Sequence, residues 1–176
     1  DGTTRLGTFE GCRNTGNITV KKEATAASDL YKCAVGGILA SAYGGTAESF
    51  VTLKNCVNDG NITVWENTFK NGGAQGAYSI GGIIGRIAPL LGNTSCSYVN
   101  PAPGAAVGFY AEIIGCSNSG TIDVCSSIDS GASSGMSGAR QCYVGGIAGI
   151  VVGLSAKPAK IDGCTNTGRI LAGGTL

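Results

Sequence analysis

Apolar and polar residues alternate in short stretches that return along the chain. Ile18 and Val20 flank one polar residue, and the same alternation recurs at 62–64 and 122–124. Because alternate side chains of a strand point to one face, each stretch predicts a short strand with one buried face. No segment shows a clear helical period, so the pattern favours an all-β chain.

A Cys-x-Asn-x-Gly-x-apolar motif lies in front of each alternating stretch. It occurs four times, starting at Cys12, Cys56, Cys116 and Cys164. An apolar residue stands three positions before each of these cysteines: Phe9, Leu53, Ile113 and Ile161. Asn tolerates left-handed backbone angles and Gly adopts them freely, so the motif predicts a turn between two strands. The units span about 9–20, 53–64, 113–124 and 161–171.

A second motif, apolar-Gly-Gly-Ile, alternates with the first. It occurs at Val35–Ile38, Ile80–Ile83 and Val144–Ile147, in units near 33–40, 78–85 and 142–149. Glycines inside short apolar strands indicate a bend or a close backbone approach. Strict alternation of two motifs indicates one structural unit stacked on the next, with variable insertions between the units.

These patterns predict one domain across 1–176, a right-handed parallel β-solenoid of about three to four coils with loop insertions. Equivalent apolar residues should then stack as core columns: Ile18, Ile62, Ile122 and Ile170 in one column, and Val35, Ile80 and Val144 in another. The alternative architecture is a β-sandwich or prism built from the same units.

Stacking would also align the polar residues of the turn. The motif asparagines (Asn14, Asn58, Asn118 and Asn166) are expected to form a ladder, each amide donating to one copy and accepting from another. The functional alternative is that they line a ligand site. The motif cysteines (Cys12, Cys56, Cys116 and Cys164) are expected to be buried thiols or disulfide staples. The chain has eight cysteines; Cys96 is one candidate partner for Cys125, and the connectivity stays open.

The composition argues against several classes of function. Only 13% of the residues are charged and the net charge is +1, which provides no basic footprint for nucleic acid. Histidine is absent, which removes the commonest general base and the commonest transition-metal ligand. No metal or cofactor is predicted, and no apolar run reaches the length of a membrane span.

Together the two motifs resemble the GLUG-type repeats of bacterial surface proteins. Ile80-Gly81-Gly82-Ile83-Ile84-Gly85 is similar to the glycine strand of these repeats, and Asn55-Cys56-Val57-Asn58-Asp59-Gly60 is similar to their turn. The resemblance implies a stacked β fold in a large exported protein, such as an adhesin, of which this chain would be a segment. It supplies no catalytic residue.

A carbohydrate-active enzyme is the catalytic alternative, because parallel β-helices host such enzymes. Glycoside hydrolysis usually uses two carboxylates. Asp123 stands where the first two copies have Thr19 and Thr63, and Asp162 or Glu112 could pair with it. An isolated, solvated strand residue is the simpler interpretation of Asp123.

Aromatic residues in or beside the insertions are the candidate ligand contacts, because exposed loop aromatics bind sugars and protein partners. The insertions span 65–78, 87–110 and 126–141, and these aromatics are Trp65, Phe69, Tyr98, Phe109 and Tyr110. We therefore expect a non-catalytic extracellular repeat module, an adhesin-like stalk or binding scaffold. Its partners would be neighbouring repeats or chains at the solenoid ends, and a glycan or host surface protein. A filament subunit joined through open ends is the second alternative.

Overall fold

The computed structural model describes residues 5–20, 34–44, 49–65, 77–89, 109–125, 141–151 and 159–172. The regular elements in these ranges are all β-strands, and they repeat in sets of five.

Each set of strands forms one coil. The first coil contains β1 (Arg5–Glu10), β2 (Arg13–Asn14), β3 (Ile18–Val20), β4 (Ala34–Gly36) and β5 (Leu39–Gly44). The second contains β6 (Ser49–Lys54), β7 (Val57–Asn58), β8 (Ile62–Trp65), β9 (Ala77–Gly81) and β10 (Ile84–Pro89). The third contains β11 (Phe109–Ile114), β12 (Ser117–Asn118), β13 (Ile122–Cys125), β14 (Gln141–Gly145) and β15 (Ala148–Val151). The described part of the fourth contains β16 (Lys160–Asp162), β17 (Thr165–Asn166) and β18 (Ile170–Ala172).

Every coil pairs in parallel with the next. The strands form five sheets, ordered β1-β6-β11-β16, β17-β12-β7-β2, β18-β13-β8-β3, β14-β9-β4 and β15-β10-β5. The register sets Ile122 beside both Ile62 and Ile170, and Ile80 beside both Val35 and Val144. The predicted parallel β-solenoid of three to four coils is confirmed, and the described strands form neither a sandwich nor a prism.

A left-handed residue marks the same corner in every coil. Gly11, Asn55, Gly115 and Gly163 lie just before the motif cysteines, with φ of 63°, 53°, 61° and 58°. Only glycine adopts this backbone conformation freely, and asparagine is among the few other residues that tolerate it. The local sequence therefore bends the chain where the first sheet of each coil meets the second. The left-handed angles expected at the motif Asn and Gly are wrong, because none of these described residues has a positive φ.

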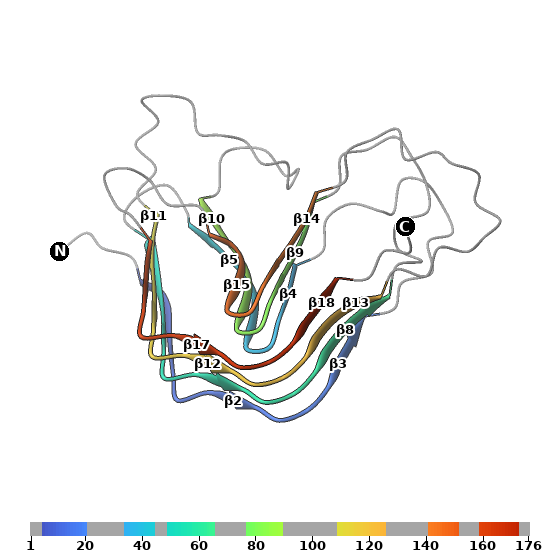
Figure 1. The fold of residues 1–176 in the computed structure, drawn as a ribbon. Helices are drawn as coiled ribbons and strands as arrows, with labels where there is room; N and C mark the ends of the chain where they lie inside the picture. Colours follow the sequence, from blue (N-terminus) through green and yellow to red (C-terminus); the bar gives the residue numbers. More distant parts are fainter. Residues whose placement is uncertain are drawn as a thin grey trace.

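The contour of a coil is an outer arc with a V-shaped bend inside it (Figure 1). The first three strands of each coil follow the arc, and the last two form the V with the glycine pair at its tip. We call each V a Gly-Gly bend: β4 with β5, β9 with β10, and β14 with β15. In Figure 1 the tips of the bends point toward the arc, near β2 and its equivalents.

The Gly-Gly bends divide the interior into two apolar clusters. The larger lies between the β6 and β11 side of the arc and the β10 side of the bend, and it includes Leu53, Ile84 and Ile113. The smaller joins Ile62 and Ile122 on the other side of the arc to Ile80. These six side chains have no exposed surface, and burying one such side chain stabilises the fold by about 1.5–3 kcal/mol.

Candidate functional site

The four motif asparagines form one hydrogen-bonded ladder through the stack. Asn14 Nδ2 donates to Asn58 Oδ1, Asn58 Nδ2 to Asn118 Oδ1, and Asn118 Nδ2 to Asn166 Oδ1, each at 2.7 Å. Each Nδ2 also donates, at 2.9 Å, to the carbonyl of the motif glycine two residues later. Asn58 and Asn118 are fully buried, so the ladder satisfies amide groups that would otherwise be costly to bury.

The tips of the Gly-Gly bends press against this ladder. A Cβ added to Gly37 would lie 2.4 Å from Asn58 Cγ, one on Gly82 would lie 2.5 Å from Asn118 Cγ, and one on Gly146 would lie 2.3 Å from Asn166 Cγ. Real Cβ atoms essentially never come this close to another heavy atom. The second glycine of the bend is therefore required by the asparagine of the next coil.

This contact joins the two motifs, and the sequence analysis missed it. The two motifs alternate strictly, which was the available signal that one could be the packing partner of the other. The residues in contact lie in different coils, and the contact depends on the bend folding inward.

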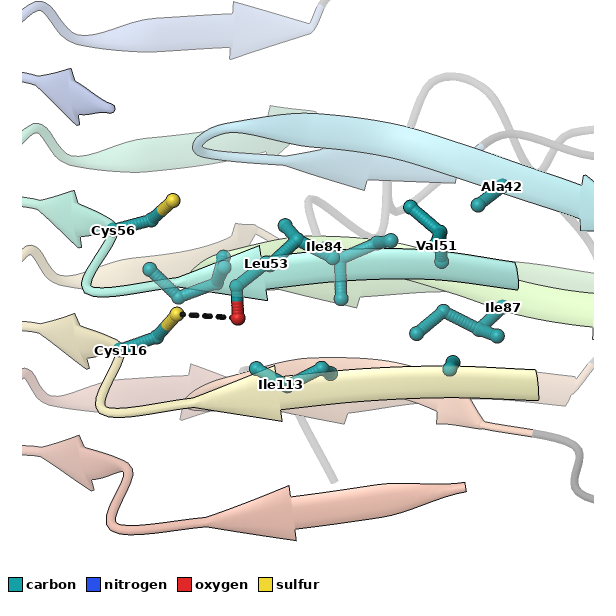
Figure 2. Packing of buried hydrophobic residues seen from close by; sticks show 10 residues of the cluster. Ala42, Val51, Leu53, Cys56, Ile84, Ile87, Ile113 and Cys116 are labelled. Atoms are coloured by element: carbon teal, nitrogen blue, oxygen red, sulfur yellow. Dashed lines mark hydrogen bonds between the residues drawn. The ribbon is translucent and has the colours of Figure 1, made fainter. Parts of the chain in front are cut away.

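The motif cysteines stack beside the asparagines and are free thiols. Cys56 donates to the carbonyl of Phe9 at 3.3 Å, Cys116 to that of Leu53 at 3.5 Å, and Cys164 to that of Ile113 at 3.4 Å. Figure 2 shows the Cys116 thiol directed to the Leu53 carbonyl within the larger apolar cluster. Each of these three thiols thus bonds the main chain of the preceding coil.

Of the two alternatives for the motif cysteines, the disulfide staple is wrong, because all four are free thiols. Cys56 and Cys116 are buried thiols and Cys12 and Cys164 are half-buried ones, and all four act as hydrogen-bond donors to main-chain carbonyls. Cys33 and Cys96 lie outside the described residues, as do the side chains of Cys125 and Cys142. The pairing of Cys96 with Cys125 stays a prediction.

Burial makes the central thiols poor nucleophiles. Desolvation raises the pKa of Cys56 above its ordinary value, and it raises the pKa of Cys116 to about 11. The reactive form of cysteine is the thiolate, so both side chains are protonated and unreactive near neutral pH. Among the described residues, no group of three or more Cys, Asp or Glu side chains is placed to hold a metal ion.

A small polar cluster lies on the outside of the turns. Asp59 accepts a hydrogen bond from Ser119 Oγ at 2.7 Å and one from Arg13 Nε at 2.9 Å. The Ser119 hydrogen bond and then the Arg13 guanidinium lower the pKa of the Asp59 carboxyl. The cluster links three successive coils, since Arg13, Asp59 and Ser119 belong to the first, second and third.

The candidate catalytic acids are divided between two sheets. Asp123 lies in β13, in register with Thr63 and Leu171. Glu112 and Asp162 lie in β11 and β16 of a different sheet. Asp162 also forms an ion pair of 3.2 Å with Lys160. The structure therefore places Asp123 in a different sheet from either proposed partner.

The candidate aromatic contacts lie at strand ends or beyond them. Trp65 is the last residue of β8, in register with Cys125, the last residue of β13. Phe109 and Tyr110 open β11, while Phe69 and Tyr98 lie outside the described residues. The three located aromatics thus stand where the solenoid strands join the insertions.

In the part of the chain that the structure describes, no helix has the length and hydrophobicity to cross a membrane. Comparison with known proteins gave no match: no protein-family model, no curated protein and no solved structure matches this chain.

Proposed function

We propose that this chain is a non-catalytic, exported repeat module. Its solenoid carries variable binding segments that begin at equivalent positions of successive coils. One observation carries the proposal: the polar side chains of the repeated turn bind the neighbouring coils. Each motif asparagine joins the ladder, and Cys56, Cys116 and Cys164 donate to the preceding coil. These groups serve the architecture, which leaves ligand binding to the segments between the motifs.

The solenoid fixes where those segments begin. β8 and β13 are paired in register up to Trp65 and Cys125, so the insertions after them start one coil apart, about 4.8 Å. The segments themselves differ in length, spanning 66–76 and 126–140. A regular frame that carries segments of different length at fixed spacing favours a binding scaffold, since loops carry function on rigid frames.

The resemblance to GLUG-type repeats supports an extracellular or cell-surface location and an adhesin-like role. The ligand classes that suit loop aromatics are glycans and host surface proteins. In this proposal Trp65, Phe69, Tyr98, Phe109 and Tyr110 supply the contacts.

The test is a binding screen of the purified chain on a glycan array and on immobilised extracellular-matrix proteins. Changing Phe69 or Tyr98 to Ala should weaken binding to any hit by roughly tenfold. The matched control is Thr19→Ala, at an exposed position of β3, which should bind as the unmodified chain does.

Two results would overturn the proposal. The first is binding that every aromatic variant retains in full, which would remove the segments from the site. The second is turnover of a glycan substrate that is lost in Asp123→Asn or Glu112→Gln, which would make the chain an enzyme.

A further inference from the structure

The four motif cysteines form a row that crosses the stack, with one thiol in each coil. The residues that follow them pair in register through all four coils: Arg13, Val57, Ser117 and Thr165. The cysteines themselves therefore occupy equivalent positions one coil apart, about 4.8 Å. Figure 2 shows two members of the row, Cys56 and Cys116, at the same point of successive coils.

The sulfur atoms repeat as regularly as the backbone. Each Sγ lies 3.4–3.9 Å from the carbonyl oxygen two residues earlier in its own coil. In the second, third and fourth coils the Sγ also lies 3.3–3.5 Å from a carbonyl oxygen of the preceding coil. Because the same groups fix each thiol, adjacent sulfur atoms are also separated by about one coil, or about 4.8 Å.

The titration of the inner thiols agrees with this spacing. Burial is the main cause of the raised pKa values of Cys56 and Cys116, and neighbouring thiols add to it. Cys12 raises the pKa of Cys56, while Cys56 and Cys164 both raise that of Cys116. Each inner thiol thus interacts with the next thiol of the row.

We propose that adjacent thiols of this row bind the soft monovalent ion Cu(I) between them. An ion midway between sulfur atoms one coil apart would lie about 2.4 Å from each, close to a metal–thiolate bond of about 2.3 Å. Soft thiolate ligands select Cu(I), and this ion accepts two sulfur ligands on opposite sides. Each ion displaces both thiol protons, so that two Cu–S bonds form and two protons pass to the solvent.

The straight row does not suit metals that need a cage of ligands. Structural zinc sites and iron–sulfur clusters take four thiolates arranged around the metal, whereas a row places at most two sulfur atoms beside one ion. Among the described residues, no group of three or more Cys, Asp or Glu side chains could hold a metal ion. Four thiols used once each make two sites, Cys12 with Cys56 and Cys116 with Cys164.

The surroundings of the row also favour a soft ion. Cys56 and Cys116 have no exposed surface and belong to the larger apolar cluster. Magnesium and calcium take oxygen ligands, and magnesium usually keeps several waters, for which a dry row of sulfur atoms leaves no place. Cu(I) needs neither.

The test uses the full chain with every cysteine outside the row changed to serine: Cys33, Cys96, Cys125 and Cys142. Cu(I) is supplied without oxygen and in the presence of a competing Cu(I) chelator, and native mass spectrometry counts the bound ions. Two ions per chain are expected. Complete loss of copper to the chelator would overturn the proposal.

Two double variants of this chain have equal numbers of thiols and serve as matched controls. Cys12→Ser with Cys56→Ser leaves the adjacent pair Cys116 and Cys164 and should hold one ion. Cys12→Ser with Cys116→Ser leaves Cys56 and Cys164, which lie two coils apart, and should hold none. Serine keeps a donor for the carbonyl of the preceding coil, and circular dichroism checks the fold. Equal copper in the two variants would contradict binding between adjacent coils.

Two further measurements on the four-thiol chain keep the proposal falsifiable if a double variant does not fold. X-ray absorption should show two sulfur neighbours around each copper ion. The dissociation constant should fall by up to about a hundredfold per pH unit between pH 6 and pH 8, because each ion displaces two protons. Three or more sulfur neighbours, or a tenfold fall that reports one displaced proton, would overturn the two-thiol site.

Discussion

The inner and outer coils carry the same motif in different surroundings. Asn118 in the third coil and Asn166 in the fourth both bond the carbonyl of their own motif glycine at 2.9 Å, yet Asn118 is buried and Asn166 exposed. Likewise, Ile113 in the third coil is buried and Ile161 in the fourth is exposed. Local sequence sets the turn in both coils, while stacking on both sides sets the burial. Matched pairs of substitutions can therefore separate the two contributions.

Glycine substitutions should show the largest difference. A Cβ on Gly120 would lie 2.0 Å from Gly60 O, whereas the nearest atom to one on Gly16 is Asn14 Oδ1 at 3.6 Å. Gly120→Ala should cost about 3 kcal/mol or more, or prevent folding, because a backbone atom cannot move aside. Gly16→Ala should change the free energy of unfolding by less than about 1 kcal/mol. Urea unfolding measures both, and equal costs would contradict the stacking geometry.

Truncations of apolar side chains should have the second largest effect on stability. Ile113→Ala should cost about 2–5 kcal/mol because it opens a cavity between the second and fourth coils. Ile161→Ala removes a side chain that is half in water and should cost less than about 1 kcal/mol. Both variants keep the motif turn intact, so thermal unfolding reports burial alone. A larger cost for Ile161→Ala would show that the fourth coil is covered.

Substitutions of the ladder asparagines should have the next largest effect on stability. Asn118→Ala removes one of the two acceptors of the buried Asn58 Nδ2 and the donor to both Gly120 O and Asn166 Oδ1, and should cost about 2–4 kcal/mol. Asn166→Ala removes one acceptor of Asn118 Nδ2 and the donor to Gly168 O, both at the more exposed end of the ladder, and should cost about 1 kcal/mol. If both variants unfold at the same urea concentration, the ladder hydrogen bonds of the inner coils contribute no more stability than those at the end.

The parallel stack and its isoleucine column could be predicted from the sequence. Ile18, Ile62, Ile122 and Ile170 stand at one offset from the motif, which is enough to align them and to predict the parallel stack. The packing of Gly82 on Asn118 was not readable, because the two residues belong to different coils and meet only when the bend folds inward. The exposure of Ile161 and Ile170 was not predictable either, because both occupy the motif positions of the buried Ile113 and Ile122. Their exposure depends on whether another coil covers them.

Thiol reactivity should distinguish the same regions. Cys56 and Cys116 are buried with raised pKa values, so native alkylation at pH 8 should modify Cys12 and Cys164 before Cys56 and Cys116, as peptide mass mapping would record. The folded state favours the protonated thiol of Cys116, so its contribution to stability is present below pH 9 and is lost as pH rises toward about 11. Rapid modification of Cys116 would mean that the inner coils open readily.

The outer polar cluster should have the smallest effect. Asp59 is held ionised by Ser119 and Arg13, which lowers its folded pKa below 3.8. The unfolded chain therefore binds the proton first as the pH falls, so the stabilisation is full near neutral pH and is lost below about pH 3.8. Asp59→Asn should narrow the stability difference between pH 6 and pH 3, and an unchanged pH profile would contradict the pKa shift.

Hydrogen exchange of equivalent amides tests most directly whether stacking or the motif sets local stability. The Ser119 and Thr167 amides each donate to an asparagine carbonyl of the preceding coil at 2.9 Å, and the Ser117 and Thr165 amides each donate to a cysteine carbonyl. The bonds match, but Ser117 and Ser119 have coils on both sides. Native-state exchange followed by NMR should show Ser117 and Ser119 at least roughly tenfold more protected than Thr165 and Thr167. Equal protection in the two coils, or slower exchange in the fourth, would contradict the account.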